Sequence, residues 1–571
     1  MTSVFEHRSH PGTSSSLVSA LTVLAVILCA SAHGSSTLTI SVKDKVLHSI
    51  DHRVFGQFME RPAFGGETGP EAAVVPGTHE LQPLAGQLIR EMRIPVLRFP
   101  GGTDVDFIDW TDMIDNAPGR KDAGRPPSKG YRGDEVSNAF GYDEFLQLCE
   151  RDGSEAILVV NLRDALLQKK PVAEAAAHAA GLIAYCAAPL DRELPGNLAL
   201  WPKLRAQNGR LKPYKVEYVQ IGNETWMFNP EAERQLGKNS VQHWQHCLEA
   251  YIDAIHAAHP DAKFIVDAFP WPVSKAIHEK YGDLITGYGV HIYHPWGIPK
   301  VLKGEELIAR SSLTQEEIWK AWTVTPRVDA RGQAVIEDGH LDHVRQFGGR
   351  VAMTEWNWNG WWGPGDDKNK IALDSQYARG IGAASLLHAI LRKADLITLA
   401  TQSMLVGKRW QITAIRVDPD NRVPAFMMPS GMVTSLYSQN SGNELLAVEI
   451  SGAEFYNQPF KMSGLEPNEK IACVDVLATK DKGKLVVHMI NRRFSGEQQV
   501  TVDCKDFNLK PQEMEIVVME GRLTDQPGEG ESLAPAQIYQ RKIPFDGELL
   551  TLTLPPRAIV FAKFSLRKMP D

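Results

Sequence analysis

The feature that most constrains the fold is an alternation, repeated eight times between residues 53 and 410, of short apolar runs with longer helix-like stretches. The runs are rich in β-branched residues and almost continuously hydrophobic, which is typical of parallel strands covered on both faces. They are Val54–Glu60, Val96–Phe99, Ala156–Leu162, Val216–Glu224, Lys263–Ala268, Tyr288–Tyr293, Arg350–Asn357 and Leu396–Gln402. The alternation predicts an α/β protein with a closed (β/α)₈ TIM barrel rather than an open, doubly wound sheet.

The stretches between the strands predict helices, and longer polar stretches predict insertions. The helix candidates are Glu80–Arg93, Tyr142–Arg151, Pro171–Ala188, Val241–Ala258 and Asp374–Arg392. Residues 116–138, 189–213 and 297–345 are polar or rich in glycine and proline, and they are predicted to be loop insertions. No strand is followed by a GxGxxG or GxxxxGK[ST] motif, which excludes the two commonest nucleotide-binding folds.

The pattern changes after about residue 412. From there, alternating strands are separated by glycine, aspartate and proline turns, without a helical stretch of comparable strength. We therefore predict a barrel over residues 53–411 and an antiparallel β-sandwich over residues 412–571. The strand-like segment Thr37–Val46, within residues 33–52, is expected to join the sandwich.

The N-terminal segment has the features of an export signal. A polar leader precedes the apolar run Leu17–Ala30, which is shorter than the roughly 20 residues needed to span a bilayer. Small residues at Ala30 and Ala32 predict cleavage after Ala32, so residues 1–32 are expected to be a signal peptide. The protein would then be exported to the periplasm or the medium. A lipoprotein attached through Cys29 and an uncleaved anchor helix remain alternatives.

Charge and cysteine content limit the possible partners. The chain has 61 Lys and Arg against 69 Asp and Glu, a net charge of −8, so it lacks the basic character of proteins that bind nucleic acid or anionic membranes. Five scattered cysteines without a CxxC pair disfavour a structural zinc site, and no metal or organic cofactor is expected. Most should be buried thiols, although Cys473 and Cys504 could pair in an oxidising compartment. A homo-oligomer is possible.

Two strands end in glutamates that suit acid-assisted cleavage of a glycoside. The fourth strand ends in Glu224 and the seventh in Glu355, and active sites of β/α barrels lie at the carboxyl ends of the strands. One carboxyl group can protonate the leaving oxygen while the other attacks the anomeric carbon, at a separation of about 5–5.5 Å in retaining enzymes. Either residue alone could equally cap a loop or pair with an arginine, but the coincidence of both favours catalysis.

Polar residues beside the two glutamates can support this chemistry. Asn223 could donate a hydrogen bond to a sugar hydroxyl near the reacting carbon. His291 and Tyr293 share one face of the sixth strand and could hold a carboxylate ionised. A metal site built from His291 and His294 is disfavoured, because those positions point to opposite faces of a strand.

Further candidates lie at the ends of other strands. Arg98 could set the charge around Glu224 or form a structural ion pair, and Glu60 and Gln402 are candidates to bind sugar hydroxyls. Trp356, beside Glu355, is a candidate substrate contact, since flat indole rings suit the apolar faces of sugars. The other tryptophans near these strand ends are Trp226, Trp271, Trp296, Trp358, Trp361 and Trp362.

These motifs resemble those of glycoside hydrolase family 51, the α-L-arabinofuranosidases, over nearly the whole predicted mature chain. The matching segments are Phe55–Glu60, with its G-x-F-x-E pattern, the Arg98–Gly102 turn, Gly222–Glu224, Glu355–Asn357 and Gln402–Leu405. The barrel followed by a sandwich that receives an N-terminal strand is also the family's domain plan.

The resemblance implies a role for each matching residue. It implies Glu224 as the general acid/base, Glu355 as the nucleophile, and Glu60, Asn223 and Gln402 as contacts to the non-reducing sugar. The sequence departs from the family pattern at Thr103, where asparagine is common, and at Thr354, where an acidic residue is common. These departures, with the insertion at 116–138, leave the retaining chemistry intact and concern the identity of the sugar.

We therefore expect an exported, retaining, exo-acting glycoside hydrolase that removes α-L-arabinofuranosyl groups from a carbohydrate substrate. The first alternative keeps the mechanism with another sugar, as in a β-galactofuranosidase, a β-xylosidase or an endo-glucanase. Two alternatives of other classes are a non-catalytic carbohydrate-binding protein and a metal-dependent hydrolase, and the retention of both glutamates weighs against the former.

Overall fold

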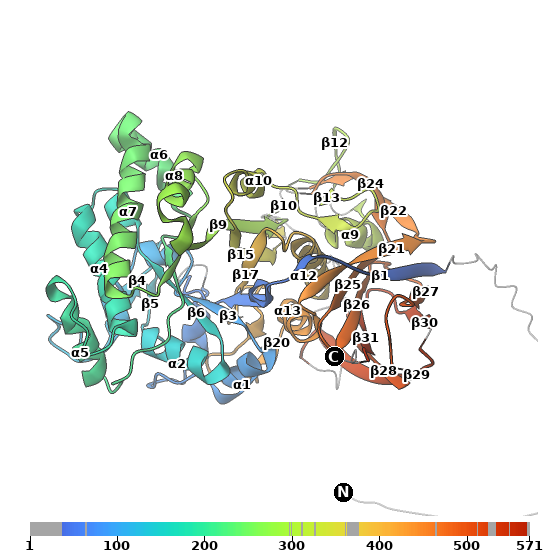
Figure 1. The fold of residues 1–571 in the computed structure, drawn as a ribbon, viewed down its shortest axis with the longest axis horizontal. Coiled ribbons are helices and arrows are strands. Elements are labelled where there is room, and N and C mark those ends of the chain that lie inside the picture. Colours follow the sequence, from blue (N-terminus) through green and yellow to red (C-terminus); the bar gives the residue numbers. More distant parts are fainter. Residues whose placement is uncertain are drawn as a thin grey trace, which may run out of the picture. The chain divides into compact units, whose positions relative to one another are not determined.

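All eight predicted strands form a closed parallel barrel in the computed structural model (Figure 1). They are β2 (Gly56–Phe58), β3 (Val96–Phe99), β6 (Glu155–Val160), β7 (Tyr218–Ile221), β8 (Lys263–Asp267), β9 (Ile285–His294), β15 (Val351–Trp358) and β17 (Ile397–Ser403). The order around the barrel is β15-β17-β2-β3-β6-β7-β8-β9, which follows the order along the chain. The predicted (β/α)₈ fold is confirmed.

The structure describes residues 37–62, 66–295, 297–298, 300–309, 312–324, 327–359, 361–362, 376–462, 465–510, 512–523, 533–547 and 549–567. The predicted signal peptide, residues 1–32 with Cys29, lies outside the described residues, as do Trp296 and the side chains of Trp361 and Trp362. None of the described helices combines the length and the apolar character needed to cross a membrane.

The predicted helices surround the barrel. They are α1 (Pro83–Met92), α2 (Tyr142–Asp152), α4 (Val172–Ala187), α7 (Ser240–Ala258) and α12 (Gln376–Leu391). In α4 the run of alanines favours a helix and packs closely against α7. Side chains between strands and helices form the main core, and a smaller cluster fills the barrel interior: Val96, Ile157, Tyr218, Ile265, Ala352 and Leu399. This smaller cluster identifies which strand positions face inward.

The three predicted insertions contain short regular elements. Residues 116–138 hold the hairpin of β4 (Ser128–Lys129) and β5 (Glu135–Val136). Residues 189–213 hold α5 (Leu200–Gln207), and residues 297–345 hold α9 (Gln315–Trp322) and α10 (Gly339–Gln346) among short strands.

A nine-stranded sheet follows the barrel. Its order is β29 (Ala536–Phe545), β28 (Gln512–Gly521), β31 (Ile559–Ser565), β26 (Lys484–Asn491), β25 (Val474–Lys480), β21 (Glu444–Ser451), β1 (Leu38–Ser49), β27 (Gln498–Asp503) and β30 (Leu549–Leu554). Strands from both ends of this order share one hydrophobic core, so the sheet curves over its own apolar face. The predicted recruitment of the N-terminal strand is confirmed, although β1 pairs parallel with β27.

One helix lies in the range predicted to contain only strands. The helix α13 (Pro429–Asn440) follows β17 and packs against α12 and α1, so it completes the helical layer of the barrel. All but one of its residues are buried, so it has no polar face and its sequence lacks the amphipathic period of a surface helix. The prediction that no helical stretch of comparable strength follows residue 412 is wrong for this reason.

All five cysteines outside the predicted signal peptide are buried and unpaired: Cys149, Cys186, Cys247, Cys473 and Cys504. Of the two possibilities for Cys473 and Cys504, the structure has free thiols.

Candidate active site

The two predicted glutamates meet at the carboxyl end of the barrel. Glu224 directly follows Asn223 at the end of β7, and Glu355 lies in β15, with β8 and β9 between the two strands. Single side-chain atoms of Glu224, Glu355 and His291 all lie within 4.8 Å of one another. Three such groups could hold a cation, but Arg98 already occupies one oxygen of Glu355, and both ring nitrogens of His291 have hydrogen-bond partners. The arrangement therefore suits proton transfer and nucleophilic attack better than metal binding.

Arg98 connects the two sides of the site from within the barrel. Its Nη1 donates to Glu355 Oε1 at 3.0 Å, and its Nη2 donates to Asn223 Oδ1 at 2.5 Å. Its Nε donates to Gln220 Oε1 at 2.7 Å, and its guanidinium group lies 4.4 Å from the centre of the Phe58 ring. With all three nitrogens bonded and no exposed surface, Arg98 fixes the position of Glu355 relative to the segment that carries Glu224.

His291 and Tyr293 lie between the glutamates, as the alternation along β9 predicts. His291 Nδ1 donates to Glu224 Oε1 at 2.9 Å and lies 3.5 Å from Glu355 Oε2, and its Nε2 bonds Thr354 Oγ1 at 3.0 Å. The Tyr293 hydroxyl donates to Glu355 Oε2 at 2.7 Å. Both oxygens of Glu355 are thus oriented by donors, while Glu224 is held by the histidine.

The backbone at Glu224 adopts a conformation that side chains seldom take. Its φ angle is +48°, in the left-handed region, and it follows Gly222 at φ +78°. Such strain persists only where the surroundings fix it. Here Asp267 Oδ2 accepts hydrogen bonds from the backbone N–H of Thr225 at 2.8 Å and from its hydroxyl at 2.5 Å, and Gln220 Nε2 donates to the Gly222 carbonyl. These contacts aim the Glu224 side chain at the site.

Glu60 is brought to the same place by the turn after β3. Gly102 has φ +65°, and a Cβ atom there would lie 2.0 Å from Glu60 Oε1. The absence of a side chain at this glycine therefore lets the carboxyl group of Glu60 approach the turn. Asp104, three residues after Gly101, accepts the backbone N–H of Tyr131 at 2.5 Å, which ties the 116–138 insertion to the rim of the site.

Burial and neighbouring charges shift the pKa values of this cluster in opposite directions. Burial, with the charges of Glu355 and Asp104, raises the pKa of Glu60 well above its usual range. Burial opposes ionisation of Glu224, but its hydrogen bond with His291 holds its pKa below the usual value. Burial lowers and the charges of Glu355 and Glu224 raise the pKa of His291, with a net increase. These directions favour a proton at the His291–Glu224 contact and the protonated form of the Glu60 carboxyl group.

Two predicted contacts lie elsewhere. Trp356 aligns with Ile292 of β9, and both side chains are buried in the main core outside the barrel interior. Gln402 Oε1 accepts hydrogen bonds from Gln57 and from Thr434 of α13, so Gln402 also points to the helical layer. Neither side chain lines the site, and these two predictions are corrected.

The physical reason is the phase of the strand alternation. Leu399 faces the barrel interior, so in β17 the inward positions are odd-numbered and Ser403, not Gln402, faces the site. In β15 a register shift between Ala352 and Glu355 sets Glu355 inward and Trp356 outward.

Some residues of the site were missed from the sequence, and the positions of others were anticipated only in part. Gln220 positions Arg98, and Asp267 positions the segment of Glu224. Both occupy strand positions of β7 and β8 that face the barrel interior, and the strand alternation could have identified them. Among the rim tryptophans, Trp226 is half-buried with its ring 5.1 Å from that of His291, so it remains beside the site. Trp358 instead packs against Gly382 of α12, and Trp271 stacks on His343 at 4.3 Å.

Comparison with known proteins agrees with this geometry. A family profile described as the alpha-L-arabinofuranosidase 1 domain matches residues 88–295. The chain is 21% identical over 512 residues to an intracellular exo-alpha-L-arabinofuranosidase of Bacteroides ovatus, an alignment that covers 88% of this chain and 90% of that protein. It is 32% identical over 160 residues to a probable alpha-L-arabinofuranosidase C of Aspergillus terreus, covering 28% and 27% of the two chains.

Solved structures are similar over the barrel and the sheet together. An alpha-L-arabinofuranosidase from Thermotoga maritima, in an arabinose complex, has a TM-score of 0.66 at 20% identity and covers 93% of this chain and 100% of its own. A GH51 alpha-L-arabinofuranosidase from Thermotoga petrophila has a TM-score of 0.65 at 21% identity, with 92% and 100% covered. At these identities the likeness establishes the fold.

Proposed function

Since the chain is a glycoside hydrolase similar to the family 51 α-L-arabinofuranosidases, we propose that it releases terminal α-L-arabinofuranosyl groups with retention of configuration. The expected substrates are plant-type polysaccharides or oligosaccharides that carry such groups. The profile match and the full-length relative support the sugar, and the site geometry supports the mechanism.

The observation that carries the mechanism is the separation of the carboxyl groups. Atoms of Glu224 and Glu355 approach within 4.8 Å, close to the roughly 5–5.5 Å of retaining glycosidases and well short of the 6.5–9.5 Å that inverting enzymes need for a water molecule. A spacing of this size favours attack on the anomeric carbon by Glu355 over attack by a water molecule held between the two groups.

Glu355 acts as the nucleophile in this proposal. Arg98 and Tyr293 donate to its two oxygens, which keeps the carboxylate ionised and aimed at the sugar. Its attack on the anomeric carbon forms an ester bond while the bond from that carbon to the leaving oxygen breaks. As negative charge leaves Glu355, the hydrogen bonds from Arg98 and Tyr293 weaken, which makes the ester intermediate susceptible to the second step.

Glu224 supplies the proton. The proton held at the His291–Glu224 contact passes through the Glu224 carboxyl group to the leaving oxygen, so that a poor leaving group departs as an alcohol. In the second step Glu224 accepts a proton from water as the water oxygen attacks the anomeric carbon and the ester to Glu355 breaks. The α configuration is restored by two inversions.

Two further groups are suited to hold the sugar. The Asn223 side chain is fully buried, and its Nδ2 has no hydrogen-bond partner among the described residues, while Arg98 fixes its Oδ1. That free donor is available for a hydroxyl group next to the reacting carbon. Glu60, protonated by virtue of its raised pKa, can donate to a second hydroxyl. Thr103 offers only a hydroxyl at the position where the family resemblance implies asparagine.

We further propose that the protein is exported after cleavage behind Ala32, on the strength of the apolar N-terminal run. The test is N-terminal sequencing of the protein from the culture fractions, where Ala32 cleavage predicts a mature chain that begins at His33. A chain that retains Met1 in the cytoplasm would contradict export. A homo-oligomer stays a possibility for sedimentation analysis.

The function is tested by turnover of a panel of aryl glycosides. The panel holds the α-L-arabinofuranoside, the α-L-arabinopyranoside, the β-D-xylopyranoside and the β-D-galactofuranoside, each with Glu355→Ala as the control. Cleavage of the arabinofuranoside that is lost in the variant supports the proposal. Preference for another glycoside would replace the sugar, and turnover that survives in the variant would overturn the assignment of the nucleophile.

A further inference from the structure

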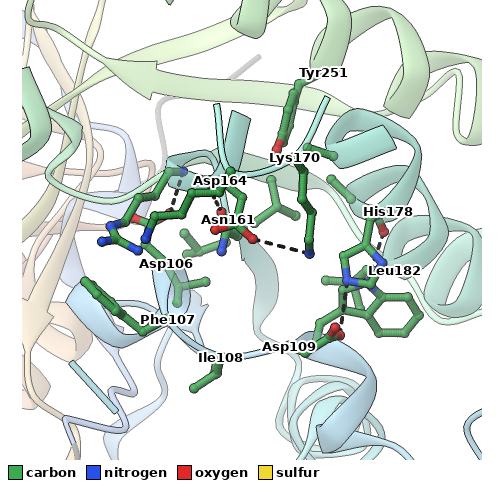
Figure 2. A pocket seen from close by; sticks show the side chains of 18 of the residues that line it. Asp106, Phe107, Ile108, Asp109, Asn161, Asp164, Lys170, His178, Leu182 and Tyr251 are labelled. Atoms are coloured by element: carbon green, nitrogen blue, oxygen red, sulfur yellow. Dashed lines mark hydrogen bonds and ion pairs between the residues drawn. The ribbon is translucent and has the colours of Figure 1, made fainter. Parts of the chain in front are cut away.

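A second cavity lies beside the barrel, on the outer side of β6. It has a volume of about 310 Å³, within the usual range of small-ligand sites, which begins near 300 Å³. Its walls come from the turn that follows η3 (Thr103–Asp106), the end of β6, α3 (Arg163–Leu166), α4 and α7 (Figure 2). None of its lining residues belongs to the site around Glu224 and Glu355.

The cavity contains polar groups that the fold does not use. Tyr251 of α7 is 1% exposed, and its hydroxyl points into the cavity without a hydrogen-bond partner among the described residues (Figure 2). Burial raises the pKa of Tyr251, so the hydroxyl keeps its proton. Asp106, also 1% exposed, uses one oxygen to accept the backbone N–H groups of Leu162 and Arg163. Its Oδ2 has no partner among the residues described.

The charged groups that line the cavity balance in sign: Asp106, Asp109 and Asp164 stand against Arg163, Lys169 and Lys170. Lys170 lies 3.3 Å from Asp164, and His178 lies 3.1 Å from Asp109. With acidic and basic side chains in equal number, the lining favours a neutral ligand over a charged one. Burial raises the pKa of Asp106 to about 7, so this group can donate as well as accept near neutral pH.

The rest of the wall is apolar. Leu182 and Ala179 of α4 and Ile108 provide aliphatic surface opposite the polar groups. A ligand with hydroxyl groups on one side and C–H groups on the other matches this division, as a pyranose or furanose ring does.

We propose that this cavity binds a neutral mono- or disaccharide as a second sugar site, distinct from the catalytic centre. Tyr251 and Asp106 bond its hydroxyl groups, and Leu182 and Ala179 pack on its apolar face.

The position of the cavity makes it a neighbour of the acid/base segment. The Arg163 guanidinium group lies 4.2 Å from the ring centre of Phe107 and 5.3 Å from that of Phe228. Phe228 ends η6 (Thr225–Phe228), which begins directly after Glu224. Asp106 also receives a backbone hydrogen bond from Asn223, so the cavity adjoins the segment that carries Glu224.

The test is calorimetric titration of the Glu355→Ala protein, which cannot turn substrate over. The titrants are L-arabinose, D-xylose and xylobiose, with inorganic phosphate as the anionic comparison. Two classes of site are expected with at least one sugar. Ala179→Phe, which fills the cavity, should remove one class, and Tyr251→Phe should weaken the same class by roughly three- to tenfold. Tyr281→Phe, which removes a surface hydroxyl bonded to Asp253, is the matched control and should change nothing.

The outcomes separate this proposal from the proposed function. Since overpacking can unfold Ala179→Phe, each cavity variant must show a cooperative thermal transition close to that of its Glu355→Ala parent before its titration is interpreted. If Ala179→Phe fails this check, the sugar affinities of Tyr251→Phe and of the control Tyr281→Phe are compared instead, and that comparison decides whether the second site exists. A single class of site that Tyr251→Phe leaves unchanged, or binding of phosphate in place of the sugars, would overturn the second site. Failure of the glycoside panel with two sugar sites present would overturn only the proposed function.

Discussion

Two buried clusters in this molecule are made of the same residue types, carboxylate, arginine and histidine, and they differ in how completely their hydrogen bonds are satisfied. In the first, Asp475 of β25 accepts from His388 and Arg392 on one oxygen, and from Arg492 and the backbone N–H of Ala334 on the other, all at 2.6–2.7 Å. One carboxylate faces several donors. The cluster joins α12 of the barrel to the nine-stranded sheet.

In the second cluster, carboxyl groups outnumber the cationic donors. Three carboxyl groups, Glu60, Glu224 and Glu355, share one arginine and one histidine. Burial opposes ionisation of Asp475, but Arg392 and Arg492 hold its pKa well below the usual value, whereas Glu60 has a raised pKa. A carboxylate surrounded by enough donors stabilises the fold. A cluster with more carboxyl groups than cationic donors keeps protons and charges available for chemistry.

The largest expected effect is that of Glu355→Ala on turnover. Removal of the nucleophile should lower kcat on every substrate by at least about 10⁴-fold. The change leaves Arg98 buried without its charge partner, but Gln220 and Asn223 still accept two of its hydrogen bonds, so the melting temperature should fall less than in the Asp475→Asn variant described below. Both are measured on the purified variant, by aryl-glycoside turnover and by calorimetry. A variant that unfolds readily while its residual activity stays high would reverse the comparison.

Glu224→Ala should separate substrates by their leaving groups. Release of an oligosaccharide needs a proton and should slow by about 10²–10⁴-fold, whereas an activated aryl glycoside leaves without one and should be affected far less in its first step. The measurement is kcat/KM for the two substrates with the same preparation. Equal losses on both would count against an acid role.

Asp475→Asn should lower the stability of the fold rather than the rate of turnover. It leaves Arg392 and Arg492 buried without their charge partner, so the free energy of unfolding should fall by roughly 3–5 kcal/mol, while kcat per folded molecule stays unchanged. Urea unfolding provides the measurement. Asp420→Asn, at a surface pair with Arg422, is the matched control and should change stability little. Equal stability of the two variants would show that the buried cluster is not structural.

The smallest effect concerns pH. Burial raises the pKa of Asp104 to about 7, against 3.8 for the free group, so between about pH 4 and pH 7 only the folded state holds this proton. Stability should therefore fall as pH rises through that window. Asp104→Asn removes this loss and keeps an acceptor for the Tyr131 N–H.

From pH 5 to pH 7.5 the wild type should lose about 2–3 kcal/mol more stability than Asp104→Asn. Urea titrations at the two pH values measure the difference. Parallel pH profiles of the two proteins would contradict the buried, protonated Asp104.

The sequence predicted the features that depend on local patterns, namely the barrel strands and the two glutamates at their ends. Eight apolar runs sufficed for the barrel, and Glu224 and Glu355 were found because each stands at the end of such a run. The orientation of Trp356 and Gln402 was not predictable from the runs alone, because it depends on a register shift in β15 and on the inward phase of β17.

The remaining differences depend on tertiary contacts. The helix α13 lacks a polar face because other helices cover it, and its sequence therefore has no helical period. The Asp475 cluster brings together residues from four separate segments of the chain, so no spacing pattern in the sequence could predict it.

The most direct test of the central claim is the anomeric configuration of the first product, followed by proton NMR during cleavage of an α-L-arabinofuranoside. Glu224 and Glu355 each place a carboxyl oxygen within 4.8 Å of the other, which predicts a double displacement through Glu355, so α-L-arabinofuranose should appear first and then mutarotate. Initial release of the β anomer would mean direct attack by water, and it would contradict the roles assigned here to both glutamates.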